Sequence, residues 1–368
     1  MSVTKRIGKD GTIRYEATVY YYVGKKRHQV SKRGFRNKKE AKRWEVKKYE
    51  EVEKNGRPIC SRKLTLKEVY DQLLTDKHNH YQYNTLYNTK KTLHYWYGDD
   101  AVINLGEMYV DKITYCDIQK FFDARDNESI NVNQNIKKAL NRVFKYAIRC
   151  QYTDHNPVDN VIVTGIDNRQ AKHVLTKYEY QTLLTILDDM DTYTSRQLKM
   201  IVQIGSNTGL RISEILALQK SDIDLKNRCI LINHKLIYKG LDKQERQIVD
   251  QLKSKASAKP AIIPESLVVE LKNWMDNLET ESLFLTEDGY FQNPDSLGNG
   301  LRRICRKKMG INFHFHLLRD TYATHLVQSN VPPKVAQELL RHQNFNTTYS
   351  IYVQVSNETK KKYANQVF

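Results

Sequence analysis

The last part of the chain carries side chains whose types and order suit chemistry on a phosphodiester. His316 and Arg319 are three residues apart, so on a helix they share one face and can grip a phosphate together. His342 follows and can hydrogen-bond the same group. Tyr352 comes last and offers a phenol that can attack phosphorus. This order predicts a site that binds a phosphate and breaks one of its ester bonds.

The composition indicates a polyanionic partner. The 368 residues include 60 Lys and Arg against 42 Asp and Glu, a net charge of +18, and a protein this basic usually binds nucleic acid. The length favours two or three domains. No apolar run of membrane-spanning length and no apolar leader is found, so we expect a cytoplasmic protein and no membrane partner. Five scattered cysteines without a CxxC pair indicate reduced thiols, neither a disulfide framework nor a zinc site.

The most basic part of the chain is residues 1–62, with 19 Lys and Arg against 7 Asp and Glu, a net charge of +12. Apolar and polar residues alternate from 13 to 23, which predicts a strand, and a second strand is expected over 27–32 after a turn at Gly24. Asn37 and Glu40 predict the start of a helix that ends near residue 55. We predict a domain with a small sheet and one helix that binds a DNA groove, although its charges also fit a merely solvated face. Its candidate DNA contacts are Arg14, Lys25, Lys26, Arg27, Lys32 and Arg33.

Residues 63–162 have the periodicity of an α-helical domain. Helices are expected over 66–74, 87–97, 115–123 and 132–150, the first of them capped by Thr65. The last helix carries a basic stripe suited to contacts with phosphates. The members of this stripe that we assign to DNA binding are Lys137, Lys138, Arg142 and Lys145.

Residues 163–173 are polar, contain a glycine and lack periodicity, so they predict a linker to a third domain over 174–368. Thr176 and Glu179 form a capping box that opens this domain. Helices are expected over 177–189, 195–207 and 211–219, strands over 228–237, 245–252 and 260–263, and helices from there to the end of the chain.

The motifs of the third domain resemble a known family. Thr208-Gly209-Leu210-Arg211-Ile212-Ser213-Glu214 precedes His316-Leu317-Leu318-Arg319, then His342 and Tyr352, and this order over about residues 174–356 is similar to the catalytic domain of the tyrosine recombinase (phage integrase) family. The two preceding domains resemble the arm-binding and core-binding domains of integrases from temperate phages and integrative conjugative elements. The implied fold is mainly α and multidomain (α+β): a three-stranded sheet with a helix, an α-helical core-binding domain, and a mainly α catalytic domain of the DNA breaking-rejoining type with a small sheet.

The resemblance implies a role for each matching residue. Arg211 and Arg319 would clamp the scissile phosphate, and Glu214 would support that site. His316 would take part in proton transfer, and His342 would donate a hydrogen bond to the phosphate. Tyr352 would be the nucleophile and form a 3′-phosphotyrosyl link.

Three positions leave alternatives open. The lysine that protonates the leaving 5′-oxygen in this family matches Lys253, with Lys255 as the alternative because the register of this stretch departs from the family pattern. Tyr349 competes with Tyr352 for the role of nucleophile. Arg341 stands where the family usually has glycine, and this departure would either add a phosphate contact or shift the turn.

The resemblance implies a site-specific recombinase that integrates and excises a mobile element or prophage through a Holliday junction. It needs neither metal nor cofactor; Asp222 and Asp224 as metal ligands are the weaker interpretation. The implied partners are double-stranded DNA with core and arm sites, a homotetramer, an excisionase and a host DNA-bending protein, at the nucleoid of a bacterial host cell. The tail beyond residue 352 would pack within its own copy or on a neighbouring one. A type IB topoisomerase, an Xer-like resolvase and a catalytically silent DNA-binding regulator remain alternatives.

Overall fold

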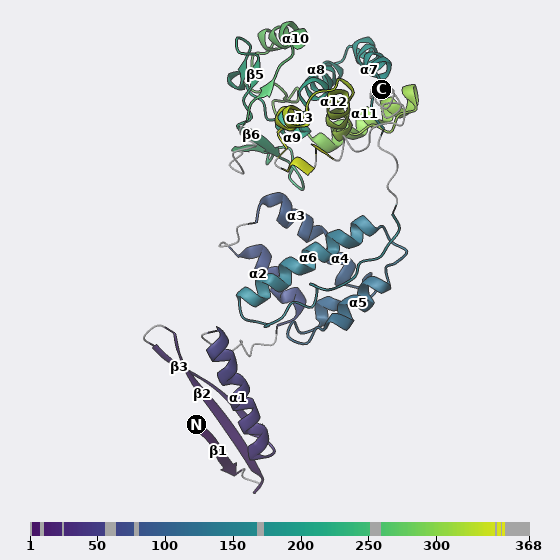
Figure 1. The fold of residues 1–368 in the computed structure, drawn as a ribbon. Helices are drawn as coiled ribbons and strands as arrows, with labels where there is room; N and C mark the ends of the chain where they lie inside the picture. The colour runs from purple at the N-terminus through teal and green to yellow at the C-terminus, as the bar shows by residue number, and fades with distance from the viewer. Residues whose placement is uncertain are drawn as a thin grey trace, which may run out of the picture. The chain divides into compact units, whose positions relative to one another are not determined.

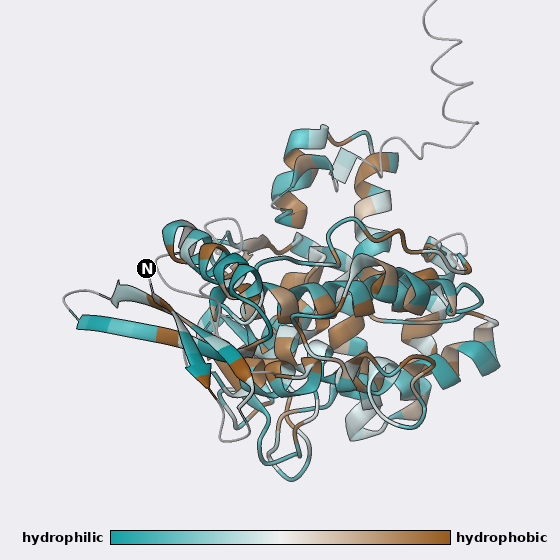
Figure 2. Cartoon of the chain, turned by 90° about the horizontal axis from the view of Figure 1, so that it is seen from below, coloured by the Kyte–Doolittle hydropathy of each residue, from teal (hydrophilic) through white to brown (hydrophobic). Residues whose placement is uncertain are grey.

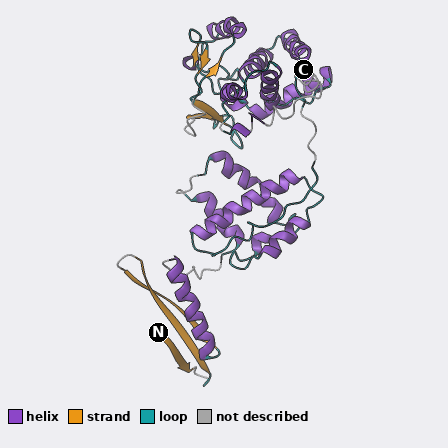
Figure 3. Cartoon of the chain, in the orientation of Figure 1, coloured by secondary structure: helices purple, strands orange, loops and turns teal. Residues whose placement is uncertain are grey.

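The computed structural model of the chain describes residues 2–7, 11–23, 26–55, 64–76, 81–167, 173–250, 259–342, 344–346 and 348–349. The chain divides into two compact units, residues 1–169 and 170–368. Helices predominate, and the strands of the described residues form three separate antiparallel sheets (Figure 3). No described helix is both long and apolar enough to cross a membrane.

The first unit begins with a three-stranded antiparallel sheet of order β1-β2-β3, with one helix against it (Figure 1). Its elements are β1 (Ser2–Ile7), β2 (Ile13–Val23), β3 (Lys26–Phe35) and α1 (Lys38–Asn55). The Asn37 side chain caps α1 by accepting a hydrogen bond from the Glu40 amide at 2.8 Å, as predicted. Ala17, Phe35 and Ala41 form a small core of their own. β3 is exposed along most of its length, and the strands near the marked N-terminus are drawn largely in teal, the hydrophilic end of the scale (Figure 2).

The rest of the first unit is a helical bundle with a separate core. The elements are α2 (Leu66–Thr75), α3 (Tyr83–Lys91), α4 (Leu93–Trp96), a 3-10 turn (Leu105–Glu107), α5 (Tyr115–Asp123) and α6 (Ile130–Arg149). Thr65 and Glu68 form the predicted capping box of α2. The expected helix over 87–97 begins earlier and is broken at Thr92, whose hydroxyl donates to the Thr89 carbonyl at 2.8 Å.

Part of the expected linker is joined to this bundle. The Ile166 amide donates to the Glu128 carbonyl at 2.8 Å, and the Asn133 side chain donates to the Thr164 carbonyl at 3.0 Å. Gly165 has a φ of 151°, and a Cβ there would lie 2.7 Å from the Glu128 carbonyl oxygen, so this close approach requires glycine. Residues 163–167 therefore pack against the start of α6.

The second unit is mainly helical, with α8 and α12 packed against each other at its centre (Figure 1). Its helices are α7 (Lys177–Met190), α8 (Tyr193–Thr208), α9 (Ile212–Ile215), α10 (Glu265–Asp276), α11 (Pro294–Met309), α12 (His316–Gln328) and α13 (Pro333–Leu340). Thr176 and Glu179 form the predicted capping box of α7. These helices and the small sheets share one large apolar core.

The prediction of one helix over 211–219 is wrong. α9 ends at Ile215, and a 3-10 turn (Lys220–Asp222) follows. Residues 216–218 are all buried, so they lack the exposed face of an amphipathic helix. The Leu218 carbonyl instead accepts a hydrogen bond from the Leu283 amide at 3.0 Å, and this long-range pairing draws the chain out of the helix.

The predicted strand over 228–237 is two strands in two sheets. β5 (Cys229–Ile230) lies between β4 (Ile223–Asp224) and β8 (Ala261–Ile262), whereas β6 (His234–Ile237) pairs with β7 (Gln247–Asp250). The chain changes sheet at Asn233, whose amide donates to Asp222 at 3.0 Å. Asp222 also accepts from the Gln219 amide at 3.0 Å, and Asp224 accepts from Asn227 at 2.6 Å. Both carboxylates therefore stabilise turns.

Candidate active site and DNA-contact surfaces

Arg211 lies at the turn between α8 and α9. Gly209 ends α8 with a φ of 65°, in the left-handed region that glycine favours. A Cβ at Gly209 would lie 2.7 Å from the ring of Tyr322 on α12, so the turn is pressed against that helix. The Arg211 side chain is 48% exposed there. It is accessible to a ligand while its backbone is fixed by two helix ends.

Glu214 is the buried centre of the predicted site. Its Oε1 accepts from Nη1 of Arg211 at 2.9 Å, and its Oε2 accepts from the Arg211 amide at 3.0 Å. Oε2 also accepts from Nη2 of Arg341 at 2.9 Å. The Glu214 side chain is 2% exposed. Two guanidinium groups thus share one carboxylate that water scarcely reaches, and the carboxylate fixes the direction of Arg211.

Arg319 connects the ends of two helices. Its residue is 3% exposed, and its two terminal nitrogens donate to the carbonyls of Gly209 and Leu340. Gly209 caps α8 and Leu340 ends α13, so both acceptors lie where a helix carries partial negative charge. Arg319 therefore holds the turn that carries Arg211 close to the segment that carries His342.

The two predicted histidines have different surroundings. Nδ1 of His342 lies 2.8 Å from the hydroxyl of Thr348, which is fully buried. His316, at the start of α12, has a 60% exposed side chain whose Nε2 lies 3.7 Å from the Asp320 carboxylate. His342 is thus held in place by a hydrogen bond, and His316 is open to solvent.

Charge sets the protonation of this cluster. Burial alone would raise the pKa of Glu214, but the charges of Arg341 and Arg211 outweigh it and lower the pKa to about 2. Burial, with the charge of Arg211 added, lowers the pKa of Arg319 to about 10. Burial and the charges of Arg319 and Arg211 lower the pKa of His342 to about 4. At neutral pH the carboxylate is ionised, the guanidinium is charged and the imidazole is neutral.

Arg341, which stands where the family usually has glycine, is buried against Glu214. It ends α13 with a φ of 53°, the left-handed conformation that costs a residue with a Cβ about 1 kcal/mol. Its side chain is 1% exposed and pairs with Glu214. The turn therefore keeps its left-handed geometry without glycine, and the guanidinium is directed at the carboxylate in the interior.

The remaining catalytic candidates lie outside the described residues. These are Lys253, its alternative Lys255, and Tyr352. Tyr349 is described: it is 51% exposed and its ring stacks on Phe345 with centroids 5.8 Å apart. The choice between the two tyrosines stays a prediction.

Comparison with known proteins agrees with the motif order. The model of the phage integrase family matches residues 173–359, which is half of the chain. The chain belongs to the phage integrase family. A tyrosine recombinase XerC-like protein of Caldanaerobacter subterraneus is 25% identical over 281 residues, covering 69% of this chain and 71% of its own. Tyrosine recombinase XerC of Bacillus licheniformis is 26% identical over 259 residues, covering 68% and 79%. This phage integrase is a tyrosine recombinase, as its motifs predicted.

Solved structures share the fold of this phage integrase. The Tn1549 transposon integrase, in complex with a circular intermediate DNA, aligns with a TM-score of 0.66 at 19% identity, over 83% of this chain and 100% of that one. A lambda integrase dimer bound to a core site aligns with a TM-score of 0.54 at 16% identity, over 95% and 94%. These likenesses confirm the predicted multidomain integrase fold.

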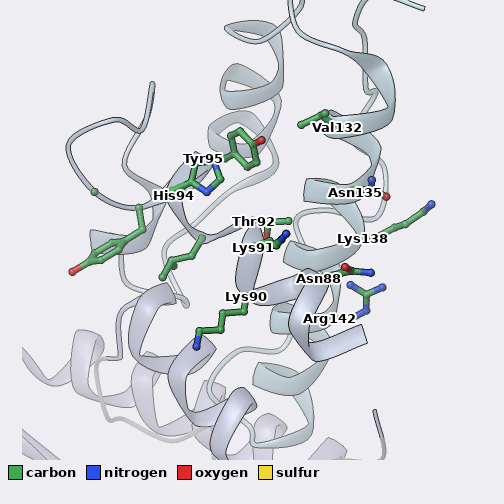
Figure 4. A pocket seen from close by; sticks show the side chains of 13 residues that line it. Asn88, Lys90, Lys91, Thr92, His94, Tyr95, Val132, Asn135, Lys138 and Arg142 are labelled. Carbon is green, nitrogen blue, oxygen red and sulfur yellow. The ribbon is translucent and has the colours of Figure 1, made fainter. Parts of the chain in front are cut away.

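The helical bundle of the integrase contains a basic pocket of about 970 Å³ between α3, α4 and α6. Asn88, Lys138 and Arg142 line this pocket, and Lys138 extends from α6 (Figure 4). Arg142 is steadied by a 3.1 Å hydrogen bond to the Thr89 hydroxyl. The predicted stripe on α6 thus divides: Lys138 and Arg142 line the pocket and Lys145 is exposed, whereas Nζ of Lys137 donates to the Val161 carbonyl at 2.6 Å.

The N-terminal sheet divides its predicted contacts in the same way. Side chains alternate along a strand, so Arg14, Arg27 and Arg33 lie on the face opposite α1. Arg27 stacks over Tyr20 at 4.0 Å, and Arg33 pairs with Glu16 at 2.8 Å. Lys26 and Lys32 are exposed but belong to the α1 side of the sheet, where Lys32 lies 5.4 Å from the Phe35 ring. Lys25 lies outside the described residues.

Sequence reasoning missed two members of the active-site cluster. Thr348, which contacts His342, is an ordinary hydroxyl with no motif to mark it, and the pairing of Arg341 with Glu214 joins residues far apart in the chain. The only signal for Arg341 was its unusual place before His342. Across the described ranges, no three His, Cys, Asp or Glu side chains are grouped so as to hold a metal ion.

Proposed function

We propose that this phage integrase inserts and removes a mobile element at specific DNA sites. The observation that carries the proposal is the cluster around Glu214, in which Arg211, Arg319 and His342 come together from three separate segments. Positive groups fixed before the substrate binds suit an anion whose charge grows in the transition state. A scissile phosphate with its non-bridging oxygens fits that description.

In the proposed reaction, the phenol oxygen of Tyr352 attacks phosphorus and the bond to the 5′-oxygen breaks. A free phenol has a pKa of about 10, so its proton must leave to a base as it attacks, and the exposed His316 is the candidate. Arg211 and Arg319 bind the non-bridging oxygens. A Thr348 hydroxyl that donates to Nδ1 of His342 leaves Nε2–H to donate to the phosphate. Lys253, or Lys255 in the alternative register, gives the leaving oxygen its proton.

For DNA binding, we propose that the two basic surfaces have separate tasks. The pocket between α3 and α6 would contact core-site DNA around the cleavage point, where Lys138 and Arg142 meet phosphates. The open face of the N-terminal sheet would lie in the groove of a distant arm site, with Arg14, Arg27 and Arg33 toward the DNA. This division corresponds to the three predicted domains, 1–62, 63–162 and 174–368.

The proposed assembly is a homotetramer on DNA that exchanges strands in pairs through a Holliday junction. An excisionase and a host DNA-bending protein would set the direction of recombination. The Tn1549 transposon integrase, which shares this fold, was solved with a circular intermediate DNA, and this supports a mobile element as the substrate. The Xer names of the sequence relatives favour a second candidate, a resolvase that acts on core sites alone.

A nicked suicide substrate tests the chemistry. Attack beside the nick releases a short oligonucleotide that diffuses away, so the covalent protein–DNA adduct accumulates and is seen on a denaturing gel. The wild type should form the adduct, and Tyr352→Phe should not, while Tyr349→Phe should. Absence of an adduct with the wild type would remove the enzymatic proposal and leave a DNA-binding regulator. An adduct with Tyr352→Phe would move the nucleophile to another residue.

A deletion of residues 1–62 separates the integrase from the resolvase candidate. The shortened protein should still cleave a core site and should lose tight binding to arm-site DNA. If the full-length and the shortened protein bind core-site and arm-site DNA with the same affinities, the result would favour a resolvase. Relaxation of supercoiled plasmid by a monomer, without strand exchange, would instead indicate a topoisomerase.

A further inference from the structure

Arg341 occupies a backbone position that suits glycine better than arginine. Its φ of 53° and ψ of 40° lie in the left-handed region, and its amide still closes α13 by donating to the carbonyls of Gln337 and Glu338. The side chain nevertheless turns inward and is 1% exposed. A large charged side chain is thus buried at a position where the backbone conformation favours glycine.

The partner of this buried charge is the carboxylate that also binds Arg211. Nη2 of Arg341 lies 2.9 Å from Oε2 of Glu214, and Nη1 of Arg211 lies 2.9 Å from Oε1. Each guanidinium takes one oxygen of Glu214. Without Arg341, the negative charge of Glu214 would act on Arg211 alone. It would then offset the positive charge of Arg211 that a bound phosphate requires.

The segment 340–342 contacts both Arg319 and Glu214. The Leu340 carbonyl accepts from Arg319, the Arg341 side chain reaches Glu214, and His342 follows directly. Nε of Arg341 is buried and has no hydrogen-bond partner among the described residues, whereas Nη2 binds Glu214. Arg341 has an indirect route to the phosphate site, through Glu214 and Arg211.

We propose that Arg341 is a positioning residue that neutralises Glu214, so that Arg211 is held by the carboxylate while its positive charge stays available to the scissile phosphate. This rests on the proposed recombinase chemistry. Arg341 itself has no need to touch DNA. Its effect depends on the charge of the substrate, which distinguishes it from a residue that only stabilises the fold.

The test compares Arg341→Lys, Arg341→Gln and Arg341→Gly on two suicide substrates. One has an ordinary scissile phosphate, and the other has a methylphosphonate, which lacks the negative charge. Adduct formation is measured in single turnovers and normalised to the folded fraction from circular dichroism. Arg302→Gln is the matched control, because Arg302 in the same unit donates to the Phe313 carbonyl at 3.0 Å but does not contact Glu214 in the described structure.

On the phosphate substrate, Arg341→Gln and Arg341→Gly should react about tenfold more slowly, less than the 100-fold or more expected for a direct phosphate donor. Arg341→Lys, which keeps the charge, should retain most of the rate. On the methylphosphonate, all three should match the wild type, as Arg302→Gln should on both substrates. An equal loss on both substrates, or a Lys variant as slow as the Gln variant, would overturn the proposal. Lack of any wild-type adduct would instead reject the recombinase chemistry.

Discussion

The described residues include an arginine–glutamate–arginine group in each unit. In the N-terminal sheet, Glu16 accepts from Arg6 and Arg33, whose side chains are 62% and 75% exposed. In the catalytic unit, Glu214 accepts from Arg211 and Arg341, of which Arg341 is 1% exposed. Both carboxylates are shielded, since the Glu16 side chain is 6% exposed and that of Glu214 is 2% exposed. The two groups differ in their arginines: both partners of Glu16 lie on the surface, whereas one partner of Glu214 is buried.

The difference teaches what each arrangement is suited to do. Exposed ion pairs contribute little to stability, and their arginines can exchange a carboxylate for a DNA phosphate at small cost. A buried group is costly to assemble and is fixed before the substrate arrives, which suits transition-state stabilisation. The N-terminal group thus fits a surface that binds DNA by charge, and the Glu214 group fits a surface that acts on one phosphate.

The largest expected effect comes from removing the central carboxylate. Glu214→Gln leaves buried guanidinium charge without compensation and should lower the free energy of unfolding of the catalytic unit by about 3–5 kcal/mol. Glu16→Gln should change the stability of its sheet far less. Hydrogen exchange of peptides from α8 and β2, followed across a urea series, measures the two units separately. Similar losses in both would contradict the contrast between the buried and the exposed group.

The next effect concerns the exposed arginine of the buried group. Arg211→Ala should slow adduct formation about 100- to 1,000-fold, the loss typical of a direct donor to a developing negative charge. Arg33→Ala, its counterpart on the sheet, should leave the rate on a saturating core-site substrate unchanged. Single-turnover rates on nicked DNA measure both. A slow Arg33→Ala variant would mean that the sheet takes part in cleavage.

Local features of the fold were predictable because their causes are close in sequence. The capping boxes at Thr65 and Thr176 and the whole of α5 agree with the predictions, since each depends on residues within one or two helical turns. α9 and the strand over 228–237 were mispredicted because contacts with distant residues, at Leu283 and Asp222, override local periodicity.

In the active site, too, local features were predictable and long-range contacts were not. Its residue types could be recognised from motif order, but the sharing of Glu214 by Arg211 and Arg341 joins residues more than 120 positions apart. The burial of individual side chains is equally hard to predict from the sequence. Lys137 and Lys138 are neighbours of one type, and only the packing of α6 directs one of them to a carbonyl and the other to the pocket.

That pair of lysines provides a smaller and well-matched test of the exposed surfaces. Lys138→Ala should weaken core-site binding and reduce the slope of log Kd against log salt concentration by about 1, as expected when one phosphate contact is lost. Lys137→Ala should leave the slope unchanged, because its ammonium is held by the Val161 carbonyl. Fluorescence anisotropy at several salt concentrations measures both slopes. An equal reduction in both variants would mean that Lys137 also reaches the DNA.

The smallest expected effect is a difference in acid sensitivity between the two units. The pKa of His342 falls from 6.5 to about 4 on folding, so its contribution to stability is complete above pH 6.5 and is lost as the pH falls toward 4. Hydrogen bonds from Arg33 and Arg6 lower the pKa of Glu16 below 4.5, so the contribution of Glu16 is lost only at more acidic pH. Between pH 6.5 and 4.5 the catalytic unit should therefore lose stability while the sheet does not, and His342→Gln should flatten this dependence. Hydrogen exchange of α8 and β2 across the same pH range, corrected for intrinsic exchange rates, measures both units; parallel losses would show that His342 is not the group that titrates.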